Sequence, residues 1–197
     1  RLAAEMLSHT VAVLERSGAV SGVLVVSRDN RALVIARRHG ARTVQESGTP
    51  ALSASLERAT RVIASWNAQA ALILPADLPL LTEEDLRTLV DLGRYHGSLV
   101  LTPDRHEQGT NALFMRPPYL LPAQLGNGSF HHYVTAGEAM KATVHIFRSE
   151  RLMLDLDTPD DLRLYLDLCQ KYAAEPMVDT TCEALQPFLA MLHKEKP

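Results

Sequence analysis

The amino-acid sequence predicts an α/β protein, a three-layer α/β/α sandwich around a mostly parallel mixed sheet. Apolar runs of strand length alternate with amphipathic helical segments through the first half of the chain, a pattern typical of such sheets. The chain has 197 residues, of which 46% are hydrophobic and 22% charged, enough for one domain with a sizeable core. Polar segments follow several apolar runs, where ligands bind in sheets of this kind.

The first half of the chain is expected to alternate between helices and strands. Apolar residues at helical spacing from Leu2 to Leu14 predict a helix that Gly18 ends. Because such a sheet normally begins with a strand, we expect the first strand and its loop to be missing. Buried apolar runs predict the strands, and apolar spacing with closing glycines predicts the helices. The expected elements are strand 22–26, helix 29–38, strand 41–44, helix 51–65, strand 70–74 and helix 82–92.

The second half of the chain is less regular. Apolar runs predict strands at 98–101 and 112–115 around a polar segment, and a long loop over 117–129 precedes a helix at 130–140. Short alternating runs predict strands at 143–147 and 152–156. Thr158 begins the last helix, with Pro159 at its first position and acids in its first turn. We expect one domain over residues 1–172 and a helical appendage over residues 173–197.

Charge and cysteine content exclude several classes of function. The net charge of −3 provides no basic field for nucleic acid or for an anionic membrane. No apolar run approaches the ~20 residues of a membrane span, and no signal-peptide pattern is present. Cys169 and Cys182 lack zinc-ligand spacing and are too few for a disulfide framework, so we expect free thiols in a reducing compartment. A cytoplasmic protein is expected.

The most informative segment runs from Ala70 to Asp85. An apolar run ends on Asp77, between two prolines, and a helix follows at once. Thr82 is the better cap for that helix, so Asp77 is placed at a strand end to meet a ligand or a metal. A simple turn at Asp77 is the alternative that the sequence leaves open.

Three further polar segments occur where strands are expected to end. Two carboxylates on separate segments, Asp77 and Asp157, suit Mg²⁺, which takes one or two protein carboxylates and completes its shell with phosphate oxygens and water. The segments 109–111 and 126–129 offer backbone N–H groups and hydroxyls for an anion, although glycine-rich loops are often plain turns. No Ser-His-Asp order, zinc spacing or Walker loop is visible. This fits a reaction whose substrate supplies its own nucleophile.

Basic side chains do not single out a phosphate clamp. His131 and His132 are neighbours that project about 100° apart on a helix, so we expect them at the surface. Arginine is the residue that best fits a phosphate fork, but the sequence does not rank the candidates. These candidates are Arg105, Arg116, Arg148 and Arg151.

Taken together, these segments resemble the family of 2-phospholactate and phosphoenolpyruvate guanylyltransferases of coenzyme F420 biosynthesis. That family has the nucleotide-diphospho-sugar transferase fold of the molybdopterin nucleotidyltransferases. The resemblance extends from Arg1 to about Leu168, and the order and spacing of the segments carry it. The matching stretches are Leu74–Pro79, Thr102–Asp104, Gly109–Leu113, Phe130–His132 and Leu156–Leu162.

The resemblance implies a metal site and an acid-phosphate site. By this resemblance Asp77 and Asp157 would hold Mg²⁺ and act in catalysis, with Asp155 as a less favoured partner. The phosphate of the three-carbon acid would be bound by a separate set of residues. This set is Thr110, Gly126 and Ser129.

The resemblance also implies a nucleotide site. Ser53 lies where the family tends to have Asn, a departure that bears on guanine preference. Arg1 and Leu2 match the end of the family's nucleotide loop, so residues 1–172 would form a nucleotidyltransferase domain that lacks this loop. The nucleotide-binding residues would be Ser53, Pro75, Ala76 and Asp77.

The function that the resemblance implies is transfer of GMP from GTP to the phosphate of phosphoenolpyruvate or 2-phospho-L-lactate, with release of pyrophosphate. A homodimer is compatible with the carboxyl-terminal appendage. One alternative is a related enzyme that uses CTP or another phosphorylated acceptor. Alternatives of a different class are a non-catalytic nucleotide-binding module and a receiver-like signalling domain. A receiver needs a lysine after its fifth strand, whereas no lysine precedes Lys141.

Overall fold

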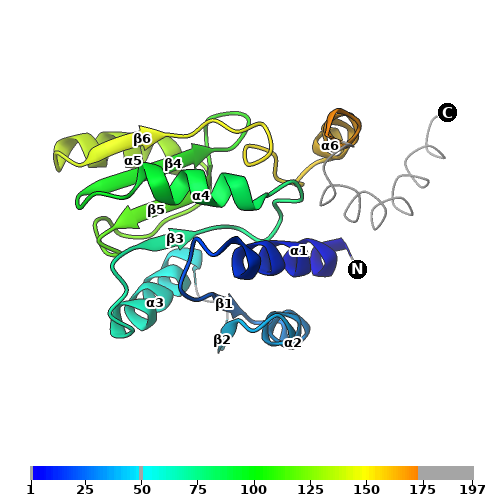
Figure 1. Cartoon of the computed structure of the whole chain (residues 1–197), viewed down its shortest axis with the longest axis horizontal. Coiled ribbons are helices and arrows are strands. Elements are labelled where there is room, and N and C mark those ends of the chain that lie inside the picture. Colours follow the sequence, from blue (N-terminus) through cyan, green and yellow to red (C-terminus); the bar gives the residue numbers. More distant parts are fainter. Residues whose placement is uncertain (1, 49–50, 173–197) are drawn as a thin grey trace.

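The computed structural model describes residues 2–48 and 51–172, and Figure 1 shows their arrangement. The helices and strands alternate along the chain largely as expected from the sequence. The helices are α1 (Leu2–Ser17), α2 (Asn30–Arg38), α3 (Leu52–Ser65), α4 (Glu83–Leu92), α5 (Ser129–Ala139) and α6 (Pro159–Lys171). The strands are β1 (Leu24–Ser27), β2 (Arg42–Gln45), β3 (Ala71–Ile73), β4 (Ser98–Pro103), β5 (Thr110–Arg116) and β6 (Thr143–Ile146).

The strands form two sheets rather than one. In the described residues β1 pairs in parallel with β2, and a separate four-stranded sheet has the order β3-β5-β4-β6. Within that sheet β5 runs antiparallel to both neighbours, whereas β4 and β6 are parallel. Strands β3, β4 and β6 therefore share one direction and only β5 is reversed, which confirms a mixed, mostly parallel sheet.

The division lies between β1 and β3, each of which is paired along one edge in the described residues. The β1–β2 pair lies below β3 in Figure 1. Leu14 of α1 packs against the apolar cluster beneath β1 and also against the cluster that includes β3. Helix α1 therefore holds the two sheets together. The expected missing first strand stays a prediction.

Alternate side chains of the four-stranded sheet face two helical layers. Val100 and Phe114 pack with α1 and α4 on one face. Leu99 and Leu113 pack with α5 on the other face, where a residue of α3 joins them. Every residue of β4 is buried, as expected for a strand covered on both sides. The three-layer arrangement predicted from the sequence is therefore present.

Two predictions from the sequence are wrong. Residues 152–156 form no strand: Leu152 and Leu154 are buried in two different apolar clusters, and this burial produces the alternation that suggested a strand. Cys169 is not a free thiol, because it is disulfide-bonded in the structure. Cys182 and the predicted appendage at 173–197 lie outside the described residues.

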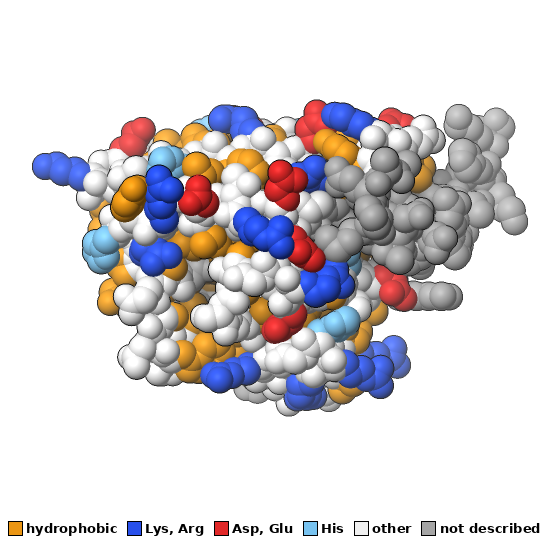
Figure 2. Space-filling view, in the orientation of Figure 1, with side chains coloured by type: hydrophobic (Ala, Val, Ile, Leu, Met, Phe, Trp, Pro, Cys, Tyr) orange, Lys and Arg blue, Asp and Glu red, His pale blue; other side chains and the backbone are white. Residues whose placement is uncertain are grey.

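The face of the molecule drawn in Figure 2 shows no large field of one sign. On the face drawn in Figure 2, Lys and Arg side chains are interspersed with Asp and Glu. This matches the weak net charge of the sequence, −3. Within residues 2–48 and 51–172, no helix is long and apolar enough to cross a membrane.

Replacing Gly93 by Ala should lower the free energy of unfolding by about 1–3 kcal/mol, the usual cost of overpacking. A Cβ at Gly93 would lie 2.2 Å from the Phe114 ring, which is itself packed in the core. Urea denaturation measures the loss. Gly22→Ala is the matched control, because a Cβ there has nothing within 4 Å, and its stability should hardly change. Equal stability of the two variants would contradict the expected clash.

Candidate active site

One edge of the four-stranded sheet collects the polar segments predicted from the sequence. Ile73 at the end of β3 pairs with Leu113, close to the start of β5. Pro103 at the end of β4 pairs with Thr110. Because β5 is reversed, its first residues lie at the edge where β3 and β4 end. The Asp77 loop, the 104–109 loop and the start of β5 therefore meet there.

Three carboxylates gather at this edge. Burial raises the pKa of Asp77, its own backbone partly offsets the rise, and repulsion from Asp155 and Asp157 raises it further. Burial likewise raises the pKa of Asp155, which is repelled by Asp157 and Asp104. Side chains that shift one another's pKa in this way lie close together. The structure therefore brings together Asp77 and Asp157, which are about 80 residues apart by their numbers.

Apolar packing brings these carboxylates together. Leu80, three residues after Asp77, is buried in the same cluster as Leu154, the residue before Asp155. Tyr165 of α6 completes that cluster. The two acidic segments are thus fixed by side chains that point away from the acids into the core.

The donor set fits a hard divalent cation that shares its shell with substrate. Asp77 Oδ1 is buried and has no hydrogen-bond partner among the described residues, so it is available to a ligand. Over the same residues no group of three His, Cys, Asp or Glu side chains is placed to hold one ion. Mg²⁺ often takes only one or two protein carboxylates, with phosphate oxygens and water completing the shell. Asp155 contributes more than Asp157 to the repulsion that raises the pKa of Asp77. The structure therefore makes Asp155 a stronger candidate for a metal ligand than the sequence suggested.

Asn111 is a site residue that sequence reasoning missed. Its side-chain Nδ2 donates a hydrogen bond of 3.0 Å to the carbonyl oxygen of Leu152. The Asn111 side chain also hydrogen-bonds Asp155 and thereby lowers the pKa of that carboxyl group, against the larger effect of burial. The two hydrogens of one amide nitrogen can serve both acceptors. The only sign of Asn111 in the sequence was its place in the segment 109–111, which was predicted to bind an anion.

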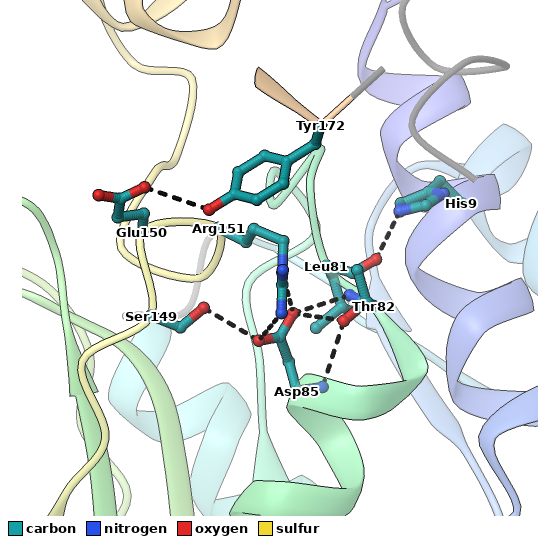
Figure 3. Close-up of polar contacts among 8 residues, drawn as sticks. All are labelled: His9, Leu81, Thr82, Asp85, Ser149, Glu150, Arg151 and Tyr172. Carbon is teal, nitrogen blue, oxygen red and sulfur yellow. Dashed lines mark hydrogen bonds and ion pairs between the residues drawn. The ribbon is translucent and has the colours of Figure 1, made fainter. Parts of the chain in front are cut away.

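A second missed group is the buried carboxylate of Asp85, which ties α4 to Ser149 and Arg151 (Figure 3). Asp85 is 1% exposed and accepts hydrogen bonds from the backbone N and the hydroxyl of Thr82. The hydroxyl of Ser149 donates to it at 2.9 Å, and Arg151 donates through Nε at 2.9 Å and a terminal nitrogen at 3.1 Å. The Arg151 guanidinium carbon lies 5.3 Å from the centroid of the Tyr172 ring. From the sequence, Asp85 was only a first-turn acid.

Of the three residues predicted to bind the acid phosphate, the structure brings the side chains of Thr110 and Ser129 into contact. Thr110 and Ser129 are buried, and their hydroxyl oxygens are 2.8 Å apart. Gly126 accepts a hydrogen bond at its carbonyl from the Ser129 backbone and has a φ of 108°, which favours glycine. Gly128 caps α5 without a side-chain bond to the first turn. The hydroxyls are thus engaged with each other, and the exposed loop presents backbone groups at a helix amino terminus.

The residues predicted for the nucleotide do not form one contact group. Pro75 and Ala76 lie in the same loop as Asp77, and Ala76 is exposed. Ser53 is exposed in the first turn of α3, directly after residues 49–50, which lie outside the described ranges. No hydrogen bond or ion pair joins Ser53 to the three carboxylates within the described chain. Its assignment stays a prediction.

The fold and the edge of acidic side chains define a class of nucleotidyltransferase-like proteins. A candidate nucleotide-diphospho-sugar transferase from Desulfovibrio desulfuricans G20 has a TM-score of 0.71 at 12% identity, over 96% of this chain and 84% of the other. A cytidylyltransferase from Leptospira borgpetersenii has a TM-score of 0.60 at 18% identity, over 98% and 87%. At such low identity these likenesses show the fold alone.

Sequence similarity narrows the class to one family. The model of the family described as "Guanylyl transferase CofC like" matches residues 1–175, so the chain belongs to this family of guanylyltransferase enzymes. The phosphoenolpyruvate guanylyltransferase of Rubrobacter xylanophilus is 37% identical over 161 residues, which cover 82% of this chain and 78% of that protein. The 2-phospho-L-lactate guanylyltransferase of Methanocaldococcus vulcanius is 29% identical over 140 residues, 71% and 61% of the two chains.

Proposed function

We propose that the protein transfers GMP from GTP to the phosphate of phosphoenolpyruvate, as a step in coenzyme F420 biosynthesis. The observation that carries this proposal is the edge of the sheet where Asp77, whose buried Oδ1 has no partner among the described residues, is repelled by nearby Asp155 and Asp157, in a chain of the guanylyltransferase family. The 37% identity to a phosphoenolpyruvate enzyme favours that acceptor over 2-phospho-L-lactate, to whose enzyme the identity is 29%.

The proposed reaction needs alignment more than acid–base chemistry. A phosphate oxygen of the acid attacks the α-phosphorus of GTP in line. The new oxygen–phosphorus bond forms as the bond from the α-phosphorus to the bridging oxygen breaks, and that oxygen leaves on pyrophosphate. The attacking phosphate is already ionised, so no protein base has to remove a proton. Both reactants are anions, and their repulsion and misorientation make up much of the barrier.

The chain's own residues suit these two demands. Asp77 with Asp155 or Asp157 would hold Mg²⁺, which would screen phosphate charge and stabilise the transition state. The backbone groups of 126–129, at the amino terminus of α5, would orient the acid phosphate. Asn111 would keep Asp155 in place through its bonds to that carboxylate and to the Leu152 carbonyl.

A pyrophosphate-release assay on the full-length protein tests the proposal. With GTP, Mg²⁺ and phosphoenolpyruvate we expect steady release that stops when any one of the three is left out. 2-Phospho-L-lactate should support a lower kcat/KM. Faster release with 2-phospho-L-lactate would show that this acid, and not phosphoenolpyruvate, is the preferred acceptor. Release without either acid would contradict the proposed transfer.

The same assay decides between GTP and CTP. Ser53 stands where the resemblance places an amide side chain against the base, so the base preference rests on other residues. We expect GTP to be used in preference to CTP and ATP because the chain belongs to a guanylyltransferase family. A higher kcat/KM with CTP would contradict the expected base preference while leaving the reaction class intact.

A further inference from the structure

The structure separates the four arginines that the sequence could not rank. Arg116 lies at the far end of β5 and donates through Nε to the carbonyl of Gly93. Arg148 is paired with Glu107 through two nitrogens and has an exposed side chain. Arg151 places two nitrogens on the buried Asp85 carboxylate. These three guanidinium groups are engaged in structural contacts or lie away from the acidic edge.

Arg105 is held differently. Its Nε lies 2.9 Å from Asp161 Oδ1 and 3.0 Å from the Nε2 atom of His106. No hydrogen bond or ion pair to its two terminal nitrogens is present among the described residues. The side chain is 28% exposed, so the terminal nitrogens can meet a ligand from solvent. A guanidinium whose Nε is held by a carboxylate presents its remaining N–H donors in a fixed fork that matches phosphate oxygens.

The loop that carries Arg105 is rigid. Asp104 accepts hydrogen bonds from the backbone N–H groups of His106 and Gln108 at 3.0 and 2.9 Å. Its second oxygen accepts the N–H of Gly109 at 2.8 Å. A Cβ on Gly109 would lie 2.8 Å from that oxygen, so the loop closes tightly around the carboxylate. The position of Arg105 is therefore set before any ligand arrives.

Arg105 also borders the acidic edge on two sides. Asp104, its neighbour in the chain, is close enough to Asp155 to repel it. Asp161, its ion-pair partner, accepts a hydrogen bond of 2.7 Å from the backbone N of Thr158, the residue after Asp157. Arg105 thus belongs to the same loops as the carboxylates of this edge, whose charge would otherwise repel an anionic substrate.

We propose that Arg105 is a substrate-binding residue whose terminal nitrogens bind a phosphate group of one of the two anionic substrates at the acidic edge. This inference rests on the proposed function for the identity of the substrates. The same phosphate chemistry is present in the triphosphate of the nucleotide and in the phosphorylated acid, and the experiment separates the two sources.

The test replaces Arg105 by Met, which keeps the length of the side chain and removes the fork. We expect the KM for either GTP or the acid to rise by about 10- to 100-fold, as for loss of a charge-assisted hydrogen bond. The substrate whose KM rises identifies the phosphate. Arg105→Lys, which restores the charge without the fork, should recover part of the loss.

Two control variants distinguish a role of Arg105 in substrate binding from a purely structural role. Asp161→Asn weakens the ion pair that holds the Arg105 Nε but leaves the guanidinium in place, so the KM of the affected substrate should rise by less than about tenfold, a smaller effect than loss of the fork itself. Arg148→Met repeats the substitution at an arginine paired elsewhere and should leave both KM values unchanged. An equal rise in KM for Asp161→Asn and Arg105→Met, or no rise for Arg105→Met, would overturn the proposal.

A binding measurement keeps this test independent of turnover. Calorimetry with Mg²⁺ and either inorganic pyrophosphate or phosphoenolpyruvate should give at least about tenfold weaker binding of one of these two probes to Arg105→Met than to wild type. If the wild-type protein released no pyrophosphate with any nucleotide, the proposed function would fail, yet this comparison would still decide the role of Arg105. Equal binding of both probes to the two proteins, or binding of neither probe to wild type, would overturn that role.

Discussion

Asp77→Asn is expected to lower the rate of pyrophosphate release by about 10²- to 10³-fold, the usual cost of losing one charge-stabilising group in an active site. The carboxylate at this position is half-buried and has one oxygen with no partner in the described residues. An amide keeps the size of the side chain but removes the negative charge that a cation requires. Initial rates at saturating GTP, acid and Mg²⁺ measure the loss.

The same substitution should leave the fold intact or make it more stable. Burial, together with repulsion from Asp155 and Asp157, raises the folded-state pKa of Asp77 above its ordinary 3.8. An acid whose pKa is raised on folding binds its proton more tightly in the folded state. Its ionisation therefore destabilises the fold as the pH rises through the raised pKa. Asp77→Asn should be at least as stable as wild type near pH 7, and this advantage should shrink below pH 3.8.

Asp91→Asn is the matched control for activity, because Asp91 is an exposed acid of α4 that pairs with Arg94, just beyond the end of the helix. We expect its turnover to equal that of wild type. Near-normal activity of Asp77→Asn would show that the acidic edge is not the reaction centre. A large loss of stability in Asp77→Asn would contradict the charge repulsion on which its pKa depends.

Asp85→Ala should have the largest effect on stability, a loss of about 3–5 kcal/mol in the free energy of unfolding. The Asp85 carboxylate is 1% exposed, and the Arg151 side chain that pairs with it is 16% exposed. Removing the acid leaves a mostly buried guanidinium beside unsatisfied donors of Thr82 and Ser149. It also ends the capping box of α4. Guanidinium chloride denaturation at pH 7 measures the loss.

A double-mutant cycle isolates the ion pair. Arg151→Ala and the double variant complete the cycle with Asp85→Ala. If the pair carries the effect, the double variant should be less destabilised than the sum of the single variants, because the interaction between the two side chains is lost only once. Strict additivity would show that Asp85 acts mainly as the cap of α4, which by itself is worth only about 1 kcal/mol.

The local pattern of the sequence was sufficient for the elements and for the first acid of the site. Period-two and helical spacing located six of the seven expected strands, because each strand buries one face or both. The spacing failed at 152–156, where alternating burial serves two separate clusters and no strand is formed. Asp77 stood out because it follows an apolar run at a strand end, where ligands bind, while Thr82 is the better cap for the next helix.

The sequence by itself therefore determined the layers, the family resemblance and the position of Asp77 at a strand end, because all of these are carried by neighbouring residues. The tertiary structure decided what depends on distant partners. Asn111 reaches the carbonyl of Leu152, 41 residues away, and Asp85 reaches Arg151, 66 residues away. It also distinguished Arg105 from three other arginines, since only folding shows which nitrogens are already bound. Contacts between distant residues produce no periodic pattern in the sequence, so these contacts can be identified only in the folded structure.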